Sequence, residues 1–331
     1  MNSIDIKQLA KILSLNPSTI SRALSDHPDI SAKTKERVKQ AAEEFNYIPN
    51  LHAKYFRQKN SGLIALILPE FNMFFTHKMI DGINSVLENS GYSIIIFISN
   101  NQLNKEIEIT RHCISWHVDG VFLSLSEQTE NLDHLQPLKN ANIPVVLLDK
   151  VIFTDQFVTV TIDDAKTALE ATKYLLNQSR KKIFGVFGNP KLEISKRRIE
   201  GFKTALLAAG HHYSEQNIVC IENLQNMEIE LQKSLSHSYD GIFIMSDELL
   251  IHAYHFMMKQ SFLPDNISMI AISDGVIPHH LFPRVNHILH SGFDLGKKAS
   301  EVLLSYIAHK DKEISHFKIE TQIIVFNTLS D

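Results

Sequence analysis

Residues 5–25 read DIKQLAKILSLNPSTISRALS and contain two short helical patterns separated by a break of three residues. In both patterns apolar side chains recur every three or four residues, as expected for one buried helix face. The apolar positions are Ile6, Leu9, Ala10 and Leu13, followed by Ile20, Ala23 and Leu24. Two short helices joined in this way predict a helix-turn-helix arrangement.

Polar residues mark the expected ends of these helices. Asn16 can cap the second helix, and Pro17 suits its first turn because an N–H there would be unpaired anyway. After a polar turn, Ser31 can cap a third helix. The inward residues of that helix would be Val38, Ala41, Ala42 and Phe45.

The N-terminal end of the second helix carries side chains suited to DNA. A recognition helix touches base edges in the major groove with this end. Arg22 could donate two hydrogen bonds to a guanine. Ser18, Thr19 and Ser21 could hold phosphates through their hydroxyls. A small helical bundle that binds nothing would show the same pattern, so the pattern alone leaves both alternatives open.

The charge distribution favours a nucleic-acid-binding end. Residues 1–60 carry ten Lys/Arg and six Asp/Glu, whereas the remaining residues carry 23 and 31. A basic segment on an acidic body is typical of a polyanion-binding module joined to a regulatory or catalytic body. A balance of +4 could also arise by chance. The charge therefore favours the DNA-binding interpretation of the helical pattern but does not decide it.

The composition is that of a globular protein with more than one domain. The chain has 331 residues, of which 44% are hydrophobic and 21% charged. It has no apolar run of membrane-spanning length and no signal-peptide pattern, so we expect a cytoplasmic, nucleoid-associated protein without a membrane partner. The two cysteines, Cys113 and Cys220, are too few for a disulfide framework, and we expect free thiols.

From residue 62 onward, short apolar runs alternate with amphipathic helical stretches. The runs are Leu63–Leu68, Ser93–Ile98, Gly120–Leu123, Val145–Leu148, Lys182–Phe187, Gly241–Met245 and Met269–Ile272. Such alternation is typical of parallel sheets with helices on both faces. A body of about 270 residues is long for one such sheet, so two sheets in two lobes are expected.

The body lacks the patterns of common nucleotide-dependent and metal-dependent enzymes. Its first apolar run ends in LPEFN, where a dinucleotide-binding fold needs a glycine-rich turn. The 17 histidines include close pairs but no pattern of two histidines and a glutamate on one helix. We therefore expect no catalytic residues, no metal and no cofactor.

The residues from Ile6 through Asn50 resemble the DNA-binding headpiece of the lactose/galactose repressor family of transcription regulators. The resemblance rests on Ala10, on Ser18-Thr19-Ile20-Ser21-Arg22 and on SAKTKERVKQAAEEFNYIPN from Ser31 to Asn50. It implies that Pro17, Ser18 and Arg22 lie at base-contacting positions. Pro17 has no donor and could offer only apolar contact, for example to a thymine methyl.

Residues 49–58, PNLHAKYFRQ, resemble the hinge of that family, which becomes a helix on operator DNA and enters the minor groove. Phe56 stands where the family has a leucine that wedges a base step. A phenyl ring could also wedge, or it could be a packing residue of a linker. Lys54 would add a phosphate contact, and Asn50 belongs to the same expected DNA-binding set.

The body resembles the periplasmic-binding-protein-type effector domain of those repressors. The expected fold is therefore an all-α helix-turn-helix headpiece with a hinge, followed by a two-lobed α/β periplasmic-binding-protein-like domain. The headpiece would comprise residues 1–48, the hinge 49–61, and the ligand-binding and dimerisation domain 62–331. The second lobe would begin near residue 161, and the two lobes would close around a small ligand.

Ligands of open α/β sheets bind at the carboxyl ends of strands. The residues expected there are Phe74, Phe75, Asp149, Asp163, Arg198, Asp247 and Asp274. The two phenylalanines could stack on a sugar ring or belong to the core. Asp163 could accept hydrogen bonds from ligand hydroxyls or simply cap the helix that follows it.

The resemblance implies that Arg198, in the stretch RIEGF, and Asp274 bind the effector. Carboxylates accept hydrogen bonds from hydroxyls and arginine donates in a fixed fork, which suits a polyol. Arg198 could instead form a salt bridge with an aspartate across the cleft when no ligand is bound. Leu192 stands where purine-binding members have a second arginine, which favours a sugar or related polar metabolite. His290 and Ser291 replace the usual Gln-Pro.

These observations predict a ligand-responsive transcriptional regulator, a repressor by resemblance, that binds a pseudo-palindromic operator. Its partners would be double-stranded operator DNA, a small effector in the cleft and a second copy of the chain, with a tetramer as the alternative state. The competing hypothesis is a sugar-binding sensor without operator-specific DNA binding. Pro17 and Phe56 are the departures that keep this hypothesis open.

Overall fold

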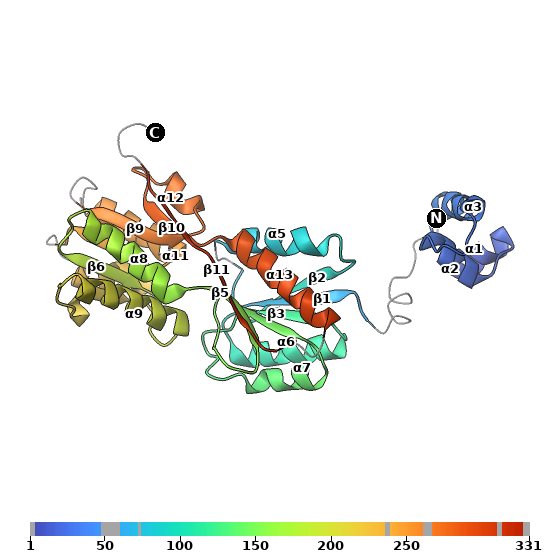
Figure 1. Cartoon of the computed structure of the whole chain (residues 1–331), viewed down its shortest axis with the longest axis horizontal. Helices are drawn as coiled ribbons and strands as arrows, with labels where there is room; N and C mark the ends of the chain where they lie inside the picture. Colours follow the sequence, from blue (N-terminus) through green and yellow to red (C-terminus); the bar gives the residue numbers. More distant parts are fainter. Residues whose placement is uncertain are drawn as a thin grey trace. The chain divides into compact units, whose positions relative to one another are not determined.

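The chain divides into two compact units (Figure 1). The first, Met1–Ser61, spans the predicted headpiece and hinge, and the second, Gly62–Asp331, is the body. The computed structural model describes residues 4–47, 60–71, 74–235, 239–260, 267–309 and 313–326. The predicted DNA contacts Asn50, Lys54 and Phe56 lie outside these described residues.

The headpiece contains the three predicted helices. They are α1 (Ile6–Leu13), α2 (Pro17–Leu24) and α3 (Ala32–Glu44). Asp5 and Gln8 form a reciprocal capping box at the start of α1, and the Ser31 hydroxyl caps α3 as predicted. Asn16 is the N-cap residue of α2 as predicted, although its side chain makes no capping hydrogen bond, and Pro17 occupies the first turn.

One apolar cluster holds the three helices together, and it confirms the predicted helix faces. Its buried members are Leu9, Ala10, Leu13, Ile20, Ala23, Val38 and Ala41. Leu24, Ala42 and Phe45 pack half-buried around it. Because these side chains point inward, the polar side chains of α2 are turned toward solvent.

The first lobe of the body is a parallel sheet with helices on both faces. Its strands are β1 (Leu63–Leu68), β2 (Ser93–Ile98), β3 (Gly120–Leu123), β4 (Val145–Leu148), β5 (Val158–Ile162) and β11 (His316–Ile319), in the order β11-β5-β4-β3-β1-β2. Helices α6 (Leu103–Ser115) and α7 (Gln136–Asn140) contribute to one apolar layer, and α5 (Thr76–Leu87) and α13 (Gly292–Ala308) to the other.

The second lobe repeats this architecture. Its strands are β6 (Ile183–Phe187), β7 (Ile218–Cys220), β8 (Gly241–Ile244), β9 (Ser268–Ser273), β10 (Asn286–Leu289) and β12 (Gln322–Ile324), in the order β12-β10-β9-β8-β6-β7. Its helices are α8 (Asp164–Asn177), α9 (Glu193–Ala208), α10 (Met227–Ser234), α11 (Asp247–Lys259) and α12 (Val276–His280). All strand pairs are parallel except β10 with β12.

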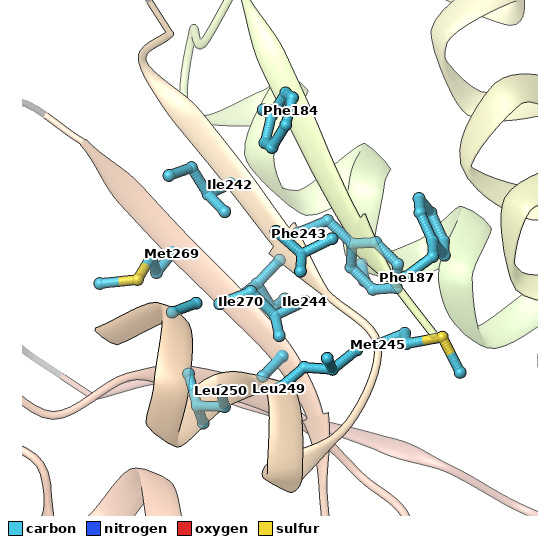
Figure 2. Close-up of a cluster of buried hydrophobic side chains, with 14 of the residues drawn as sticks. Phe184, Phe187, Ile242, Phe243, Ile244, Met245, Leu249, Leu250, Met269 and Ile270 are labelled. Atoms are coloured by element: carbon cyan, nitrogen blue, oxygen red, sulfur yellow. The ribbon is translucent and has the colours of Figure 1, made fainter. Parts of the chain in front are cut away.

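A buried apolar core that includes several phenylalanines fills the second lobe (Figure 2). The Phe187 ring of β6 lies 5.5 Å from the Phe202 ring of α9 and 5.5 Å from the Phe243 ring of β8, measured between centroids. The core ends at Met245, whose sulfur accepts a hydrogen bond from the Gly188 N–H at 2.9 Å. Met245 therefore lies where the apolar core meets the carboxyl ends of the strands.

The chain crosses between the lobes three times, after β5, β10 and β11, so both lobes are built from segments far apart in sequence. The two-lobed α/β fold class is confirmed, as are the seven predicted apolar strands. The strands that the sequence did not predict include β7 and β11, which are three and four residues long and lie at sheet edges. Within the described part of the chain, no helix has the length and apolarity to cross a membrane.

Glycines allow the helices on each lobe to approach closely. A Cβ added at Gly296 of α13 would lie 2.0 Å from the carbonyl oxygen of Met79 in α5. One added at Gly201 of α9 would lie 2.0 Å from the carbonyl oxygen of Ala165 in α8. Both obstacles are backbone atoms, so no side-chain rotation can relieve the clash.

Gly296→Ala is therefore expected to destabilise the body, although alanine is the better helix former by about 1 kcal/mol. Forcing α13 away from α5 should lower the free energy of unfolding by about 1–3 kcal/mol, measured by urea denaturation. The control is Glu301→Ala, an exposed position of the same helix, which should change stability by less than about 0.5 kcal/mol. A Gly296→Ala variant as stable as the wild type would contradict the close packing.

Candidate functional site

The headpiece presents the N-terminal end of α2 to solvent. Pro17, Ser18 and Arg22 are exposed, whereas Thr19 and Ser21 are half-buried. The three exposed side chains can therefore reach base edges, and the two half-buried hydroxyls lie closer to the helix bundle. This arrangement matches what a recognition helix requires.

Two lysines that the sequence analysis did not assign lie beside this helix. Lys7 and Lys11 of α1 are exposed and line a groove together with Pro17 and Thr19. They are four residues apart, so they share one face of α1. The spacing of these two lysines is the signal that would have placed them near the N-terminal end of α2.

In the body, the carboxyl ends of strands from both lobes surround a cavity of about 540 Å³. Five of the seven residues predicted to bind effector line it: Phe75, Asp149, Arg198, Asp247 and Asp274. We name this cavity the cleft.

The other two predicted residues have different positions. Phe74 is not among the side chains that line the cleft, and its backbone N–H donates to a carboxylate oxygen of Glu248 at 3.2 Å. Asp163 caps α8 by accepting from the Lys166 N–H at 3.3 Å, and it pairs with Lys318 at 2.6 Å. Asp163 therefore caps a helix, which is the second of the two roles predicted for it, and Asp163 does not line the cleft.

Arg198 forms the ion pair that the sequence analysis considered, but with Asp164 rather than a residue across the cleft. Its Nε donates to the Asp164 carboxylate at 2.9 Å, and one terminal nitrogen donates to the carbonyl of Met245. The side chain is only 3% exposed. Its other terminal nitrogen, Nη2, has no hydrogen-bond partner among the described residues. One buried donor of Arg198 is therefore left for a ligand.

Asp149 is a second buried group with an unused hydrogen-bonding capacity. It follows β4 with φ of 59°, a left-handed conformation that Asp and Asn adopt more readily than most residues. No donor among the described residues reaches its carboxylate, and burial raises its pKa to about 6. A ligand hydroxyl or amine would supply the missing donor.

Asp247 and Asp274 stand at the ends of β8 and β9. Burial raises the pKa of Asp247 to about 6, although its carboxylate accepts from the Ser273 hydroxyl and the Asp274 N–H. Asp274 reaches from the second lobe to the first. Its carboxylate accepts from the Gly292 N–H at 2.8 Å and lies 2.8 Å from Lys78 Nζ. Asp274 therefore lines the cleft and also joins the two lobes.

The apolar side of the cleft includes an aromatic pair. The Phe75 ring stacks on the imidazole of His290, with centroids 5.4 Å apart and an interplanar angle of 27°. Burial lowers the pKa of His290 to about 3, with a further contribution from the charge of Arg198, so this imidazole is neutral at physiological pH. Its Nε2 has no partner among the described residues. Leu192 also lines the cleft.

Sequence reasoning missed Asp164, Lys78 and the cleft-lining position of His290. Asp164 directly follows Asp163, and only the exact start of α8 decides which of the two faces Arg198. Lys78 pairs with a residue 196 positions away, and no local pattern reports such a contact. The signal for His290 was its position after a strand, the same signal that identified Asp149 and Asp274.

Comparison with known proteins identifies two matching family models. Residues 6–50 match the bacterial regulatory proteins of the lacI family. Residues 61–327 match the periplasmic binding proteins and sugar binding domain of the LacI family. Together the two models cover almost the whole chain.

Individual proteins are similar over the full length. Catabolite control protein A of Priestia megaterium is 24% identical over 310 residues, covering 92% of this chain and 93% of that protein. The ribose operon repressor of Halalkalibacterium halodurans is 25% identical over 333 residues, covering 98% and 96%. A solved transcriptional regulator CelR–cellobiose complex has the same fold, with a TM-score of 0.73, 21% identity and coverage of 97% and 98%.

The raised pKa of Asp149 predicts how stability depends on pH. The folded state binds this proton more tightly than the unfolded state, so the contribution of Asp149 to stability is present below about pH 4 and is lost as the pH rises through about 6. An asparagine at this position cannot ionise, and asparagine tolerates the left-handed backbone. Asp149→Asn should therefore raise the free energy of unfolding by about 1–3 kcal/mol at neutral pH.

Urea denaturation of both proteins between about pH 4 and pH 8 measures this difference, which should shrink toward zero at the acidic end. Asp155→Asn, at an exposed position, is the matched control and should show no comparable gain. A gain from Asp149→Asn that is equal at all pH values would mean that ionisation of Asp149 is not its cause.

Proposed function

This chain belongs to the LacI family of bacterial regulatory proteins, and we propose that it is a repressor that binds a pseudo-palindromic operator as a dimer under the control of a small polar ligand. The observation that carries the proposal is the cleft, where Arg198 Nη2 and His290 Nε2 are buried without a hydrogen-bond partner among the described residues and the buried Asp149 also lines the cavity. In the same chain, α2 is a recognition helix with an exposed N-terminal end, and it makes the DNA contact that the ligand controls.

The DNA-binding half of the proposal rests on α2. Its exposed N-terminal end enters the major groove, and Arg22 donates to a guanine. Lys7 and Lys11 add charge near the phosphates, which strengthens binding to any sequence. Pro17 contributes apolar contact only. A dimer places two copies of α2 on two half-sites, which is why the operator has pseudo-palindromic symmetry.

The effector half rests on the mixture of donors and acceptors in the cleft. Arg198 Nη2 donates to an oxygen of the ligand, and Asp149 accepts from a ligand hydroxyl. The stacked Phe75 and His290 offer an apolar face to a sugar ring. One protein of the same fold is described in complex with cellobiose, a polyol, and we extend this class of ligand to the present chain.

The ligand controls DNA binding by changing the arrangement of the two lobes of the body. A ligand shifts the DNA-binding equilibrium only through its different affinities for two conformations of the body. Asp274 supplies such a difference, because its carboxylate lines the cleft while it is bonded to Lys78 and Gly292 of the other lobe. A ligand that engages Asp274 changes the contact that holds the lobes together.

Two measurements test the proposal together. Selection of duplexes from a random library by the purified protein, followed by gel-shift titration, should yield a pseudo-palindromic site. A thermal-shift screen of sugars and nucleosides should then yield a ligand that raises the melting temperature by mass action and changes operator affinity. A ligand that binds without any sequence-specific DNA binding would instead support a sensor protein.

Arg22→Ala should weaken binding to the selected operator by about ten- to a hundredfold, because a bidentate arginine–guanine contact contributes about 1–3 kcal/mol of discrimination. It should also relax the preference for guanine at one position of each half-site. The control is Lys39→Ala, an exposed cation on α3, which should leave the sequence preference unchanged. Unchanged affinity and preference in Arg22→Ala would remove Arg22 from the recognition set.

Arg198 has a structural and a ligand-binding role that two variants separate. Arg198→Met leaves the buried Asp164 carboxylate without its partner and should lower the free energy of unfolding by about 3–5 kcal/mol. The double variant Arg198→Met/Asp164→Asn removes both charges and should recover most of that loss.

Both variants should need about ten- to a hundredfold more ligand for the operator response, because a hydrogen bond to a charged group contributes about 1.5–3 kcal/mol. Urea denaturation and operator titration with the ligand found by screening measure the two effects. A stable double variant that responds at the wild-type ligand concentration would show that Arg198 does not bind the effector.

A further inference from the structure

The charges that line the cleft are far from balanced. Among the described residues, seven carboxylates and only two cations line it. Both cations already have a carboxylate partner: Arg198 pairs with Asp164 at 2.9 Å, and Lys150 pairs with Glu127 at 3.5 Å. The cleft therefore offers no unpaired positive charge from the described residues.

Two of the seven lining carboxylates have a cationic partner, Glu127 with Lys150 and Asp274 with Lys78. The other five have none within ion-pair distance among the described residues. They are Glu70, Asp149, Glu222, Asp247 and Glu248. Asp149 and Asp247 are buried at the ends of β4 and β8. Buried carboxylates are normally paired with a cation or a metal. The described residues supply no such cation for Asp149 and Asp247, so a ligand could supply it.

Two unpartnered buried groups show where a ligand would sit. Arg198 Nη2 and His290 Nε2 are both without a hydrogen-bond partner among the described residues and belong to cleft-lining side chains less than one tenth exposed. The arginine donor needs an oxygen acceptor, which a hydroxyl provides. The Asp149 carboxylate needs a donor, and an ammonium group would also compensate its charge.

We infer that the effector is a polyol bearing a protonated amine, as in an amino sugar, and that Asp149 and Asp247 exclude phosphorylated and carboxylated sugars. The inference rests on the proposed effector cleft and specifies its ligand class. The amine lies against Asp149, a hydroxyl oxygen accepts from Arg198, and the ring packs on Phe75. An anionic substituent would meet unpaired carboxylates at low dielectric, where like-charge repulsion is least screened.

Matched ligand series test the inference whatever the stereochemistry of the effector. For the gluco, galacto and manno configurations, the aminohexose, the neutral hexose, the N-acetyl derivative, the uronate and the 6-phosphate are titrated into the full-length protein at about pH 7, where Asp149 is largely ionised. Binding is measured by thermal shift and calorimetry. In the configuration that binds, the amine should bind at least about tenfold more tightly than the neutral sugar, and the two anions more weakly still.

Substitution at Asp149 identifies the group responsible. Asp149→Asn should reduce the preference for amine over neutral sugar by about tenfold, and Asp149→Asn/Asp247→Asn should also admit the uronate. Asp155→Asn, at an exposed position outside the cleft, should leave the order of affinities unchanged. Because Asp149→Asn is expected to fold at least as stably as the wild type, lost selectivity cannot be attributed to unfolding.

The outcomes separate this inference from the proposed function. A phosphate or uronate that binds as well as its neutral parent, or a neutral or N-acetyl sugar that equals the amine, overturns the charge selectivity while the repressor function stands. The absence of binding by every amine and neutral sugar, in a protein that still binds its operator, overturns the ligand class. Tight amine binding that leaves operator affinity unchanged supports the inference and contradicts the proposed function.

Discussion

The ion pair between Arg198 and Asp164 fixes the geometry of the cleft. It joins α9 to the first turn of α8, and the second bond of the guanidinium joins both helices to Met245 at the end of β8. A buried arginine is tolerated only when its charge is compensated. Because Asp164 provides that compensation from within the protein, the guanidinium of Arg198 is held in place beside the cavity before any ligand arrives.

The same principle governs the contact between the lobes. Asp274 is buried, and its charge is compensated by Lys78 and by the Gly292 N–H at the start of α13. Both partners belong to the first lobe, whereas Asp274 follows a strand of the second. The carboxylate therefore stabilises one arrangement of the lobes, and its residue also lines the cleft. Such a shared group is what linkage between ligand binding and conformation requires.

The sequence predicted the features that arise from local pattern. Strands β1, β3 and β4 are buried and appear as continuous apolar runs, and together with the partly exposed edge strand β2 they were predicted with their observed bounds. Residues after strand ends, such as Asp149 and Asp274, were expected at the cleft and line it. Features that depend on one residue of register or on distant partners were not predicted. Asp163 and Asp164 differ only in which lies at the first position of α8, and the pairing of Lys78 with Asp274 spans the two lobes.

A buried arginine in a ligand cavity ordinarily suggests an anionic ligand, because the guanidinium fork matches carboxylate and phosphate groups. The hydrogen-bond partners of Arg198 argue against an anionic ligand in this cleft. Asp164 occupies the Nε side of the fork, Met245 takes a second nitrogen, and among the described residues only Nη2 is left without an acceptor. A single donor on a neutralised arginine suits a hydroxyl oxygen better than a bidentate anion. The buried carboxylate of Asp149 strengthens this conclusion, because it repels an anion and attracts a donor. The ligand class therefore follows from the compensation of each charge rather than from the identity of the arginine.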